Sequence, residues 1–222
     1  MNLHQFIENF CLRDLTTIDR KYMILKYLWK TKEVNGCVVE MGCNEGYVST
    51  FIQATLNSIC QHKSLFLYDS FEGVRGATQE NDGAFFEEGL DNGAFDATRE
   101  QLSSNFKKYN MKPFCVSQKD LRTLQQRDLP ENISFAYIDL DIYSPTKNVL
   151  GKIWSALSTG GSIIIDDYYL GWCAGVKQAV DEFICENSQT FNIPKYSHQA
   201  QDDYWYFRNA EKSGWALALT KE

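Results

Sequence analysis

The sequence lacks several features that would place a chain of 222 residues in a specialised class. No apolar run is long enough to cross a bilayer, so we expect no membrane span. The first residues have neither the basic segment nor the long apolar stretch of a secretory signal, and we expect a cytoplasmic protein. Positive charge is also scarce, with 22 Lys and Arg against 29 Asp and Glu. The net charge of −7 argues against a nucleic-acid backbone as a partner.

Cysteine pairs and linkers are missing as well. None of the seven cysteines forms a C-x-x-C pair, so we expect reduced thiols and no metal site built from cysteine. The sequence has no internal repeat, low-complexity tract or linker rich in proline and glycine. We therefore expect residues 1–222 to form a single domain, which is long enough to bury a full hydrophobic core.

What the sequence does contain is an alternation of short apolar runs with helical patterns. This alternation favours an α/β fold in which a mostly parallel sheet carries helices on both faces and ends in an antiparallel hairpin. The expected seven strands are 37–42, 64–70, 113–120, 133–141 and 162–167, followed by the hairpin strands 204–208 and 215–220.

Three further segments have features of their own. Residues 1–32 are predicted to be a helical region. Residues 74–98 form a polar stretch longer than ordinary connecting loops, which predicts a lid or a substrate-binding loop. In the helix before the fifth strand, Ser144 is the predicted cap and Pro145 the first helical residue, and the pair Gly160–Gly161 is predicted to end the helix.

The end of the first predicted strand carries Glu40, Gly42 and Gly46. Two glycines between a strand and a helix allow a tight bend and a close approach to a ligand, although a purely structural turn would use them too. Asp69 ends the second strand, where an acid is positioned to bind the two hydroxyl groups of a ribose. Its alternative role is that of a turn or capping residue. Together, these residues favour a ligand that contains a nucleoside.

The fourth and fifth predicted strands end in four aspartates: Asp139, Asp141, Asp166 and Asp167. Carboxylates that lie close together repel one another unless a cation offsets them, and oxygen-only ligands suit a hard ion such as Mg²⁺. Helix capping is an alternative for Asp141 and Asp167. Period-two alternation turns Asp139 and Asp141 to the same face of a strand, so the sequence does not separate their roles.

The pattern E-x-G-x-x-x-G followed by an acid resembles the class I S-adenosylmethionine-dependent methyltransferases, which have a Rossmann-like fold. The stretches "YDSFEGV" (68–74), 137–150 and 160–183 further resemble the macrocin O-methyltransferase family, whose members methylate sugar hydroxyls in antibiotic assembly. The resemblance implies S-adenosylmethionine as the cofactor and a sugar or glycoside hydroxyl as the small-molecule acceptor, and it is compatible with a homo-oligomer. The implied cofactor-binding residues are Glu40, Gly42, Gly46, Asp69, Ser70, Ser117 and Asp139.

The resemblance also implies a metal and a base. It assigns Mg²⁺ to Asp139, Asp166 and Asp167. The metal would lower the pKa of the acceptor hydroxyl, and a carboxylate would take its proton. Asp139 is the first candidate for this catalytic base and Asp141 is the alternative.

Several alternatives stay open. The loop "GCNEGY" departs from the family's G-V-W-R-G-G, since it loses an arginine and gains Glu45. This departure motivates a non-catalytic nucleoside-binding or scaffold protein on the same fold. A metal-independent methyltransferase is another alternative, and a nicotinamide oxidoreductase is disfavoured by the missing third glycine. Tyr143, Tyr168 and Tyr169 either line a sugar pocket or pack in the core.

Overall fold

The computed structural model describes residues 17–187, 210–213 and 215–222. The strands in these ranges form one seven-stranded sheet in the order β3-β2-β1-β4-β5-β7-β6. The first five strands are parallel, whereas β7 runs antiparallel to both β5 and β6. The strands are β1 (Cys37–Met41), β2 (Leu65–Asp69), β3 (Cys115–Gln118), β4 (Ile133–Ile138), β5 (Leu157–Ile165), β6 (Ala210–Ser213) and β7 (Ala216–Thr220).

The predicted α/β class and mostly parallel sheet are therefore confirmed. The closing antiparallel pair is confirmed as well, but the strand predicted at 204–208 lies outside the described residues. In the described residues β7 lies between β5 and β6, and β6 is the other strand of the closing pair. The first part of the predicted N-terminal helical region, residues 1–16, also lies outside the described residues.

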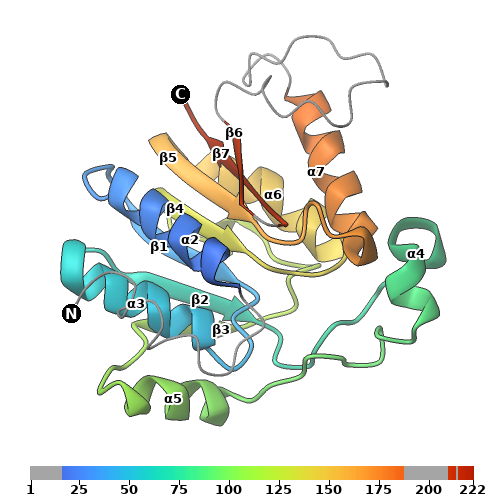
Figure 1. Ribbon diagram of the computed structural model, residues 1–222, viewed down its shortest axis with the longest axis horizontal. Helices are drawn as coiled ribbons and strands as arrows, with labels where there is room; N and C mark the ends of the chain where they lie inside the picture. The colour runs from blue at the N-terminus through green and yellow to red at the C-terminus, as the bar shows by residue number, and fades with distance from the viewer. Residues whose placement is uncertain (1–16, 188–209, 214) are drawn as a thin grey trace.

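Helices cover both faces of this sheet (Figure 1). On one face, α2 (Ile18–Lys30) packs against α3 (Tyr47–Ile59), and α5 (Arg99–Lys108) packs beside α3. On the other face, α6 (Tyr143–Ala156) packs against α7 (Ala174–Glu186). The short helix α4 (Gln79–Glu87) contacts α7 and the 3₁₀ turn η2 (Gly171–Cys173), and a second 3₁₀ turn, η1 (Gln126–Asp128), precedes β4.

The alternation of side chains along the central strands creates two hydrophobic cores. In β4, Phe135 and Tyr137 pack on the side of α2 and α3, whereas Ala136 and Ile138 pack on the side of α6 and α7. Because all four side chains are buried, β4 has apolar or aromatic residues on both faces. Such a strand places polar groups at its ends, where the sheet is open.

Two predicted helix boundaries are wrong. Helix α6 begins at Tyr143, before the predicted cap Ser144, and the carboxylate of Asp82 accepts a hydrogen bond of 2.7 Å from the Tyr143 N–H. The cap therefore comes from a residue 61 positions away, which local spacing does not reveal. The helix ends at Ala156, and the predicted terminators Gly160 and Gly161 lie inside β5. There the Gly160 N–H donates to the carbonyl of Lys221 at 2.7 Å.

The segment 74–98 contains α4, which the sequence did not predict. Its two ends are joined where the Val74 N–H donates to the Ala94 carbonyl at 2.8 Å and the Gly93 N–H donates back to the Val74 carbonyl at 3.1 Å. Asp82, which is buried, connects α4 to the start of α6. The role of this segment as a lid or substrate loop stays a prediction.

The helices in the described ranges are all too short or too polar to cross a membrane.

Candidate active site

The carboxyl ends of the parallel strands meet at one edge of the sheet, where a cavity of about 770 Å³ opens. The strand order reverses between β1 and β4. Ligands of open α/β sheets bind at such a switch point, outside the carboxyl ends of the strands. The lining of this cavity includes residues that follow β1, β2, β4 and β5.

The turn after β1 needs its two predicted glycines for different reasons. Gly42 has a φ of +85°, and a Cβ atom added to it would lie 1.8 Å from the Asp139 carbonyl oxygen. Gly46 has a φ of +81° and immediately precedes α3, and a Cβ atom added to it would lie 3.0 Å from the Leu102 side chain of α5. Gly42 lines the cavity, whereas Gly46 is outside the lining and gives the turn its shape.

Asp69 fixes the conformation of this turn and also lines the cavity. Its carboxylate accepts hydrogen bonds of 2.7 Å from the N–H groups of Asn44 and Phe71. Burial raises the pKa of Asp69, and these backbone hydrogen bonds partly offset the rise. The predicted turn role is thus correct, and the position in the cavity leaves a ribose-binding role open.

Of the two serines predicted for the cofactor site, one lines the cavity and the other does not. Ser70 lines the cavity next to Asp69. Ser117 lies inside β3, opposite Tyr68, and is not part of the lining. Asp120 and Leu121, which follow β3, take its place. The sequence missed them because β3 ends at Gln118 and the chain reaches the cavity only after the strand has ended.

Glu40 is a buried acid in the cavity wall. It is 1% exposed, and its Oε2 atom has no hydrogen-bond partner among the described residues. Burial raises its pKa to about 8. An orphaned carboxylate oxygen is costly in the interior, and a cationic ligand group would remove this cost.

Asn44 and Phe95 connect the glycine turn to the segment 74–98. The Asn44 side-chain amide donates to the Phe95 carbonyl at 2.8 Å. Phe95 lines the cavity and is 46% exposed, so an apolar ring is available to a ligand there. Local spacing does not predict this contact, because the two residues are 51 positions apart.

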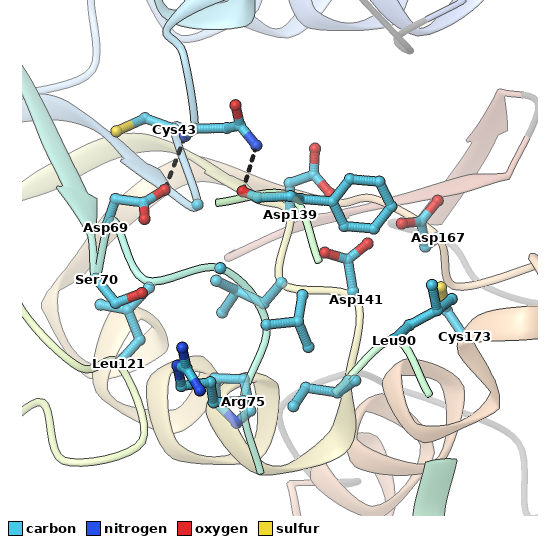
Figure 2. A pocket seen from close by; sticks show the side chains of 18 of the residues that line it. Cys43, Asp69, Ser70, Arg75, Leu90, Leu121, Asp139, Asp141, Asp167 and Cys173 are labelled. Carbon is cyan, nitrogen blue, oxygen red and sulfur yellow. Dashed lines mark hydrogen bonds between the residues drawn. The ribbon is translucent and has the colours of Figure 1, made fainter. Parts of the chain in front are cut away.

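The aspartates occupy the other end of the cavity. Figure 2 shows Asp69 and Ser70 at one end, Asp167 and Cys173 at the other, and Asp139 and Asp141 between them. Strand β4 ends at Ile138, and Asp141 has a φ of +61°. The period-two argument therefore does not apply to Asp139 and Asp141, because the backbone leaves the strand before the second acid.

These acids are not fully offset by the positive charges of the described chain. Burial, together with the charge of Asp166, raises the pKa of Asp141 to about 6 and that of Asp167 to about 8. The same causes raise the pKa of Asp139 well above its ordinary range. The site would gain from a further cation.

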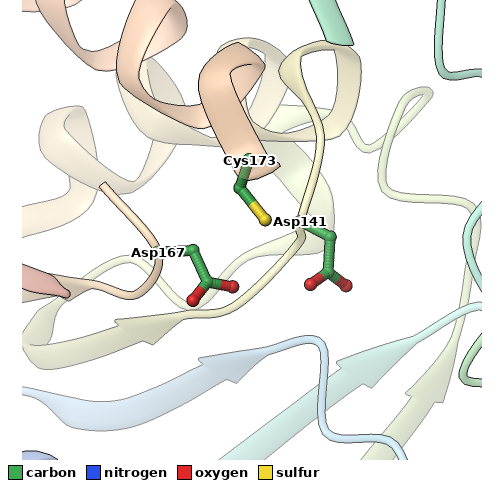
Figure 3. Close-up of side chains that lie close together, drawn as sticks. All are labelled: Asp141, Asp167 and Cys173. Atoms are coloured by element: carbon green, nitrogen blue, oxygen red, sulfur yellow. The ribbon is translucent and has the colours of Figure 1, made fainter. Parts of the chain in front are cut away.

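Asp141, Asp167 and Cys173 are close enough to share one ion. One ligand atom from each residue lies within 4.8 Å of the others. Figure 3 shows the Cys173 sulfur directed toward the two carboxylates. The sequence did not predict Cys173, which η2 brings beside the acids. Two carboxylates suit a divalent cation such as Mg²⁺, whereas a thiol suits softer ions.

Asp166, a predicted metal ligand, lies behind the cavity wall. Its side chain is fully buried, and it is not part of the lining. Its Oδ2 atom accepts hydrogen bonds from Arg20 and from the Tyr137 hydroxyl, and its Oδ1 atom accepts one of 3.0 Å from the Asp167 N–H. Of the three predicted ligands, the cavity thus contains Asp139 and Asp167, and Asp141 takes the place expected for Asp166.

The aromatic wall of the cavity also differs from the expectation. Tyr143, Tyr168 and Tyr169 are absent from the lining. The hydroxyl of Tyr168 donates to Asp181 at 2.5 Å, and that of Tyr143 donates to Glu182 at 2.8 Å. Two tryptophans that the sequence did not suggest, Trp172 and Trp215, line the cavity with exposed fractions of 50% and 44%.

Comparison with known proteins gives a family match over most of the chain. The family model of macrocin O-methyltransferases (TylF) matches residues 25–205. A demethyldecarbamoylnovobiocin O-methyltransferase of Streptomyces niveus is 25% identical over 165 residues, which are 68% of this chain and 58% of that protein.

A second relative also matches part of the chain, and one solved structure shares its fold. An 8-demethyl-8-(2,3-dimethoxy-alpha-L-rhamnosyl)-tetracenomycin-C 4'-O-methyltransferase of Streptomyces olivaceus is 29% identical over 147 residues, 63% of this chain and 56% of that protein. The chain thus matches less than three fifths of the length of either relative. The O-methyltransferase NovP shares the fold with a TM-score of 0.74 at 18% identity, covering 92% of this chain and 80% of the other.

Proposed function

The chain belongs to the macrocin O-methyltransferase family, and on this premise we propose that it is an S-adenosylmethionine-dependent O-methyltransferase. Its acceptor is a hydroxyl group of a sugar or of a glycosylated small molecule. The name of one relative, which methylates the 4' position of a rhamnosyl tetracenomycin, supports this acceptor class. The two ends of the cavity support the reaction, because one suits a nucleoside cofactor and the other suits an acceptor hydroxyl.

The cofactor fits the end of the cavity formed by the turn after β1. Gly42 lines this end, its missing side chain lets the Asp139 backbone pack directly against the turn, and Asp69 is held where it can accept hydrogen bonds from ribose hydroxyls. The orphaned oxygen of Glu40 suits the ammonium group of the methionine part. Phe95 and Leu121 provide apolar surface for the adenine ring.

A divalent cation, Mg²⁺ in our proposal, fits the acid-lined end. Mg²⁺ is commonly held by one or two carboxylates together with water and substrate oxygens, and Asp141 and Asp167 provide two. When bound, the ion would lower the pKa of the acceptor hydroxyl and orient its oxygen. The raised pKa values of the three cavity acids support the fit, because burial and the neighbouring carboxylates make their ionised forms costly and a bound cation would offset that cost.

Asp139 is our candidate for the catalytic base. It lies between the cofactor end and the pair Asp141–Asp167, where its carboxylate can take the proton of an acceptor hydroxyl held at that pair. In the reaction a bond forms between the acceptor oxygen and the methyl carbon while the carbon–sulfur bond breaks. The hydroxyl proton passes to Asp139, and S-adenosylhomocysteine leaves.

The two tryptophans support a sugar acceptor. Trp172 and Trp215 are large, exposed aromatic surfaces in the cavity lining. An indole ring offers a wide apolar face together with an N–H donor, a combination that suits a ring with both C–H and O–H groups. We infer that the sugar lies against at least one of these faces.

The observation that carries the proposal is the single cavity that joins Gly42 and Asp69 to Asp139, Asp141 and Asp167. The test is transfer of a labelled methyl group from S-adenosylmethionine to the rhamnosyl tetracenomycin named above and to a panel of related glycosides. We expect transfer in Mg²⁺ and its loss in EDTA. Equal transfer in EDTA would remove the metal from the proposal, and a failure to bind S-adenosylmethionine would support the non-catalytic scaffold instead.

A further inference from the structure

Arg20 reaches the acid-lined end of the cavity from α2. It lies five positions before the residues matched by the family model, 25–205, so the family match says nothing about it. The side chain is only 6% exposed, yet part of it lines the cavity. Its guanidinium lies over the ring of Trp215, with 5.4 Å between Cζ and the ring centroid.

The guanidinium contacts both acids that follow β5. One of its terminal nitrogens donates to Oδ2 of Asp166, and the same nitrogen lies 3.6 Å from Oδ1 of Asp167. Tyr137 donates its hydroxyl to the same oxygen of Asp166. A guanidinium is charged throughout the ordinary pH range, and its ion pair with Asp166 is buried on both sides.

Through Asp166, these contacts determine how Asp167 is presented to the cavity. The second oxygen of Asp166 accepts the N–H of Asp167 at 3.0 Å, so Asp166 connects Arg20 to the backbone of the next residue. Asp167 has a φ of +58°, a conformation that residues other than glycine adopt at some cost in energy. The side chain of Asp167 thereby comes within 4.8 Å of the ligand atoms of Asp141 and Cys173.

We propose that Arg20 is a positioning residue for the divalent-cation site. It neutralises Asp166, which keeps that acid out of the cavity, and it holds the Asp166–Asp167 turn so that Asp167 presents its carboxylate beside Asp141. This inference rests on the proposed metal-assisted methyl transfer. It adds to the metal site a residue of α2 that lies outside the region matched by the family model.

The test is the affinity for Mn²⁺, a paramagnetic substitute for Mg²⁺, measured by the electron paramagnetic resonance signal of the free ion. We expect Arg20→Gln to weaken Mn²⁺ binding by about 10-fold to 100-fold, the range typical of residues that orient metal ligands. Arg20→Lys keeps the charge and should recover part of this loss. Lys30→Gln is the matched control, because it removes a positive charge from the same helix and a 3.1 Å contact with Thr220 of β7.

Two further measurements separate this role from simple stabilisation. Thermal unfolding shows whether each variant is folded at the temperature of the titration. In our proposal S-adenosylhomocysteine binds at the opposite end of the cavity, so calorimetry with it should give the native affinity in Arg20→Gln if only the metal site has changed.

The outcomes are distinct. Native Mn²⁺ affinity in a folded Arg20→Gln protein would overturn the role of Arg20 and leave the proposed function intact. Tighter Mn²⁺ binding in this variant would also overturn it, because Arg20 would then compete with the ion. If the native protein binds S-adenosylhomocysteine but no Mn²⁺, both the metal site and the role of Arg20 are wrong.

Discussion

Gly42 lies directly against the backbone of Asp139: a Cβ atom on the glycine would be 1.8 Å from the Asp139 carbonyl oxygen. The Asp139 N–H in turn donates to the Met41 carbonyl at 2.9 Å. The turn proposed to bind the cofactor and the residue proposed to act as base are therefore in contact. A substitution that moves the turn at Gly42 should therefore also move Asp139.

The first prediction concerns Gly42→Ala. The added methyl group has no room, and a φ of +85° is unfavourable for alanine, so the turn after β1 must move. We expect a loss of stability of about 1–3 kcal/mol and S-adenosylhomocysteine binding at least about tenfold weaker. Thermal unfolding and calorimetry measure the two effects.

Gly151→Ala in α6 is the matched control for Gly42→Ala. An added Cβ at Gly151 meets no atom within 4 Å, and alanine favours the interior of a helix. The control should bind S-adenosylhomocysteine as the native protein does and be equally or slightly more stable. Equal binding by both alanine variants would show that the turn at Gly42 does not approach the cofactor.

The second prediction is a proton release on cofactor binding. Burial raises the pKa of Glu40 to about 8, so at pH 7 the free protein carries Glu40 mostly protonated. An ammonium group favours the ionised form, and binding therefore expels the proton. We expect the affinity for S-adenosylhomocysteine to rise between pH 6 and pH 8, by at most about tenfold per unit. Calorimetry at pH 7 in buffers of different ionisation enthalpy counts the released protons.

The variant Glu40→Gln sharpens this test. It should release no proton from this position and bind with a flatter pH profile. The stability of the ligand-free protein changes with pH in the opposite direction. Because the pKa of Glu40 is higher in the folded protein than its ordinary value of 4.5, Glu40 contributes stability below pH 4.5, and this contribution is lost as the pH rises through about 8. A native proton release that persists unchanged in Glu40→Gln would assign it to another group.

The third prediction separates the roles of Asp139 and Asp141. If Asp141 is a metal ligand, Asp141→Asn should weaken Mn²⁺ binding by at least about tenfold. If Asp139 is the base, Asp139→Asn should keep Mn²⁺ affinity within about threefold and lower kcat by about 100-fold to 10,000-fold. Metal titrations and steady-state rates with the same acceptor measure both. The reverse pattern would exchange the two roles.

The fourth prediction uses Cys173 to distinguish ions. The thiol lies beside Asp141 and Asp167, and soft ions prefer sulfur whereas Mg²⁺ does not. We expect Cys173→Ser to keep Mg²⁺-supported activity within about threefold and to raise the Cd²⁺ concentration needed for half inhibition at least about tenfold. An identical Cd²⁺ response in the native protein and the variant would show that the thiol does not contact the ion.

The sequence predicted the parts of the fold that depend on local pattern. The parallel strands, their order along the chain and helix α3 follow from apolar periodicity, which is strong in buried strands and amphipathic helices. The glycine turn and Asp69 were also predictable, because the residue type is imposed by backbone geometry. Helix α4 was missed, since its nine residues are mostly polar and include Gly83 at non-helical angles.

The finer arrangement of the acids was not predictable. Asp141 and Asp167 both have positive φ angles just after their strands end. As a result, Asp141 lines the cavity and Asp166, the predicted ligand, does not. The arrangement depends further on Arg20, which meets Asp166 across 146 positions of sequence. A pattern of spacing shows that acids gather at a sheet edge, but tertiary contacts decide which of them an ion could reach.

The central claim is that the cavity at the edge of the sheet binds the methyl-donor cofactor. Calorimetric titration of the native protein with S-adenosylhomocysteine tests it most directly, because the measurement does not depend on knowing the acceptor. We expect one site per chain, with binding weakened in Gly42→Ala and unchanged in Gly151→Ala. A native protein that binds neither S-adenosylhomocysteine nor S-adenosylmethionine would contradict it.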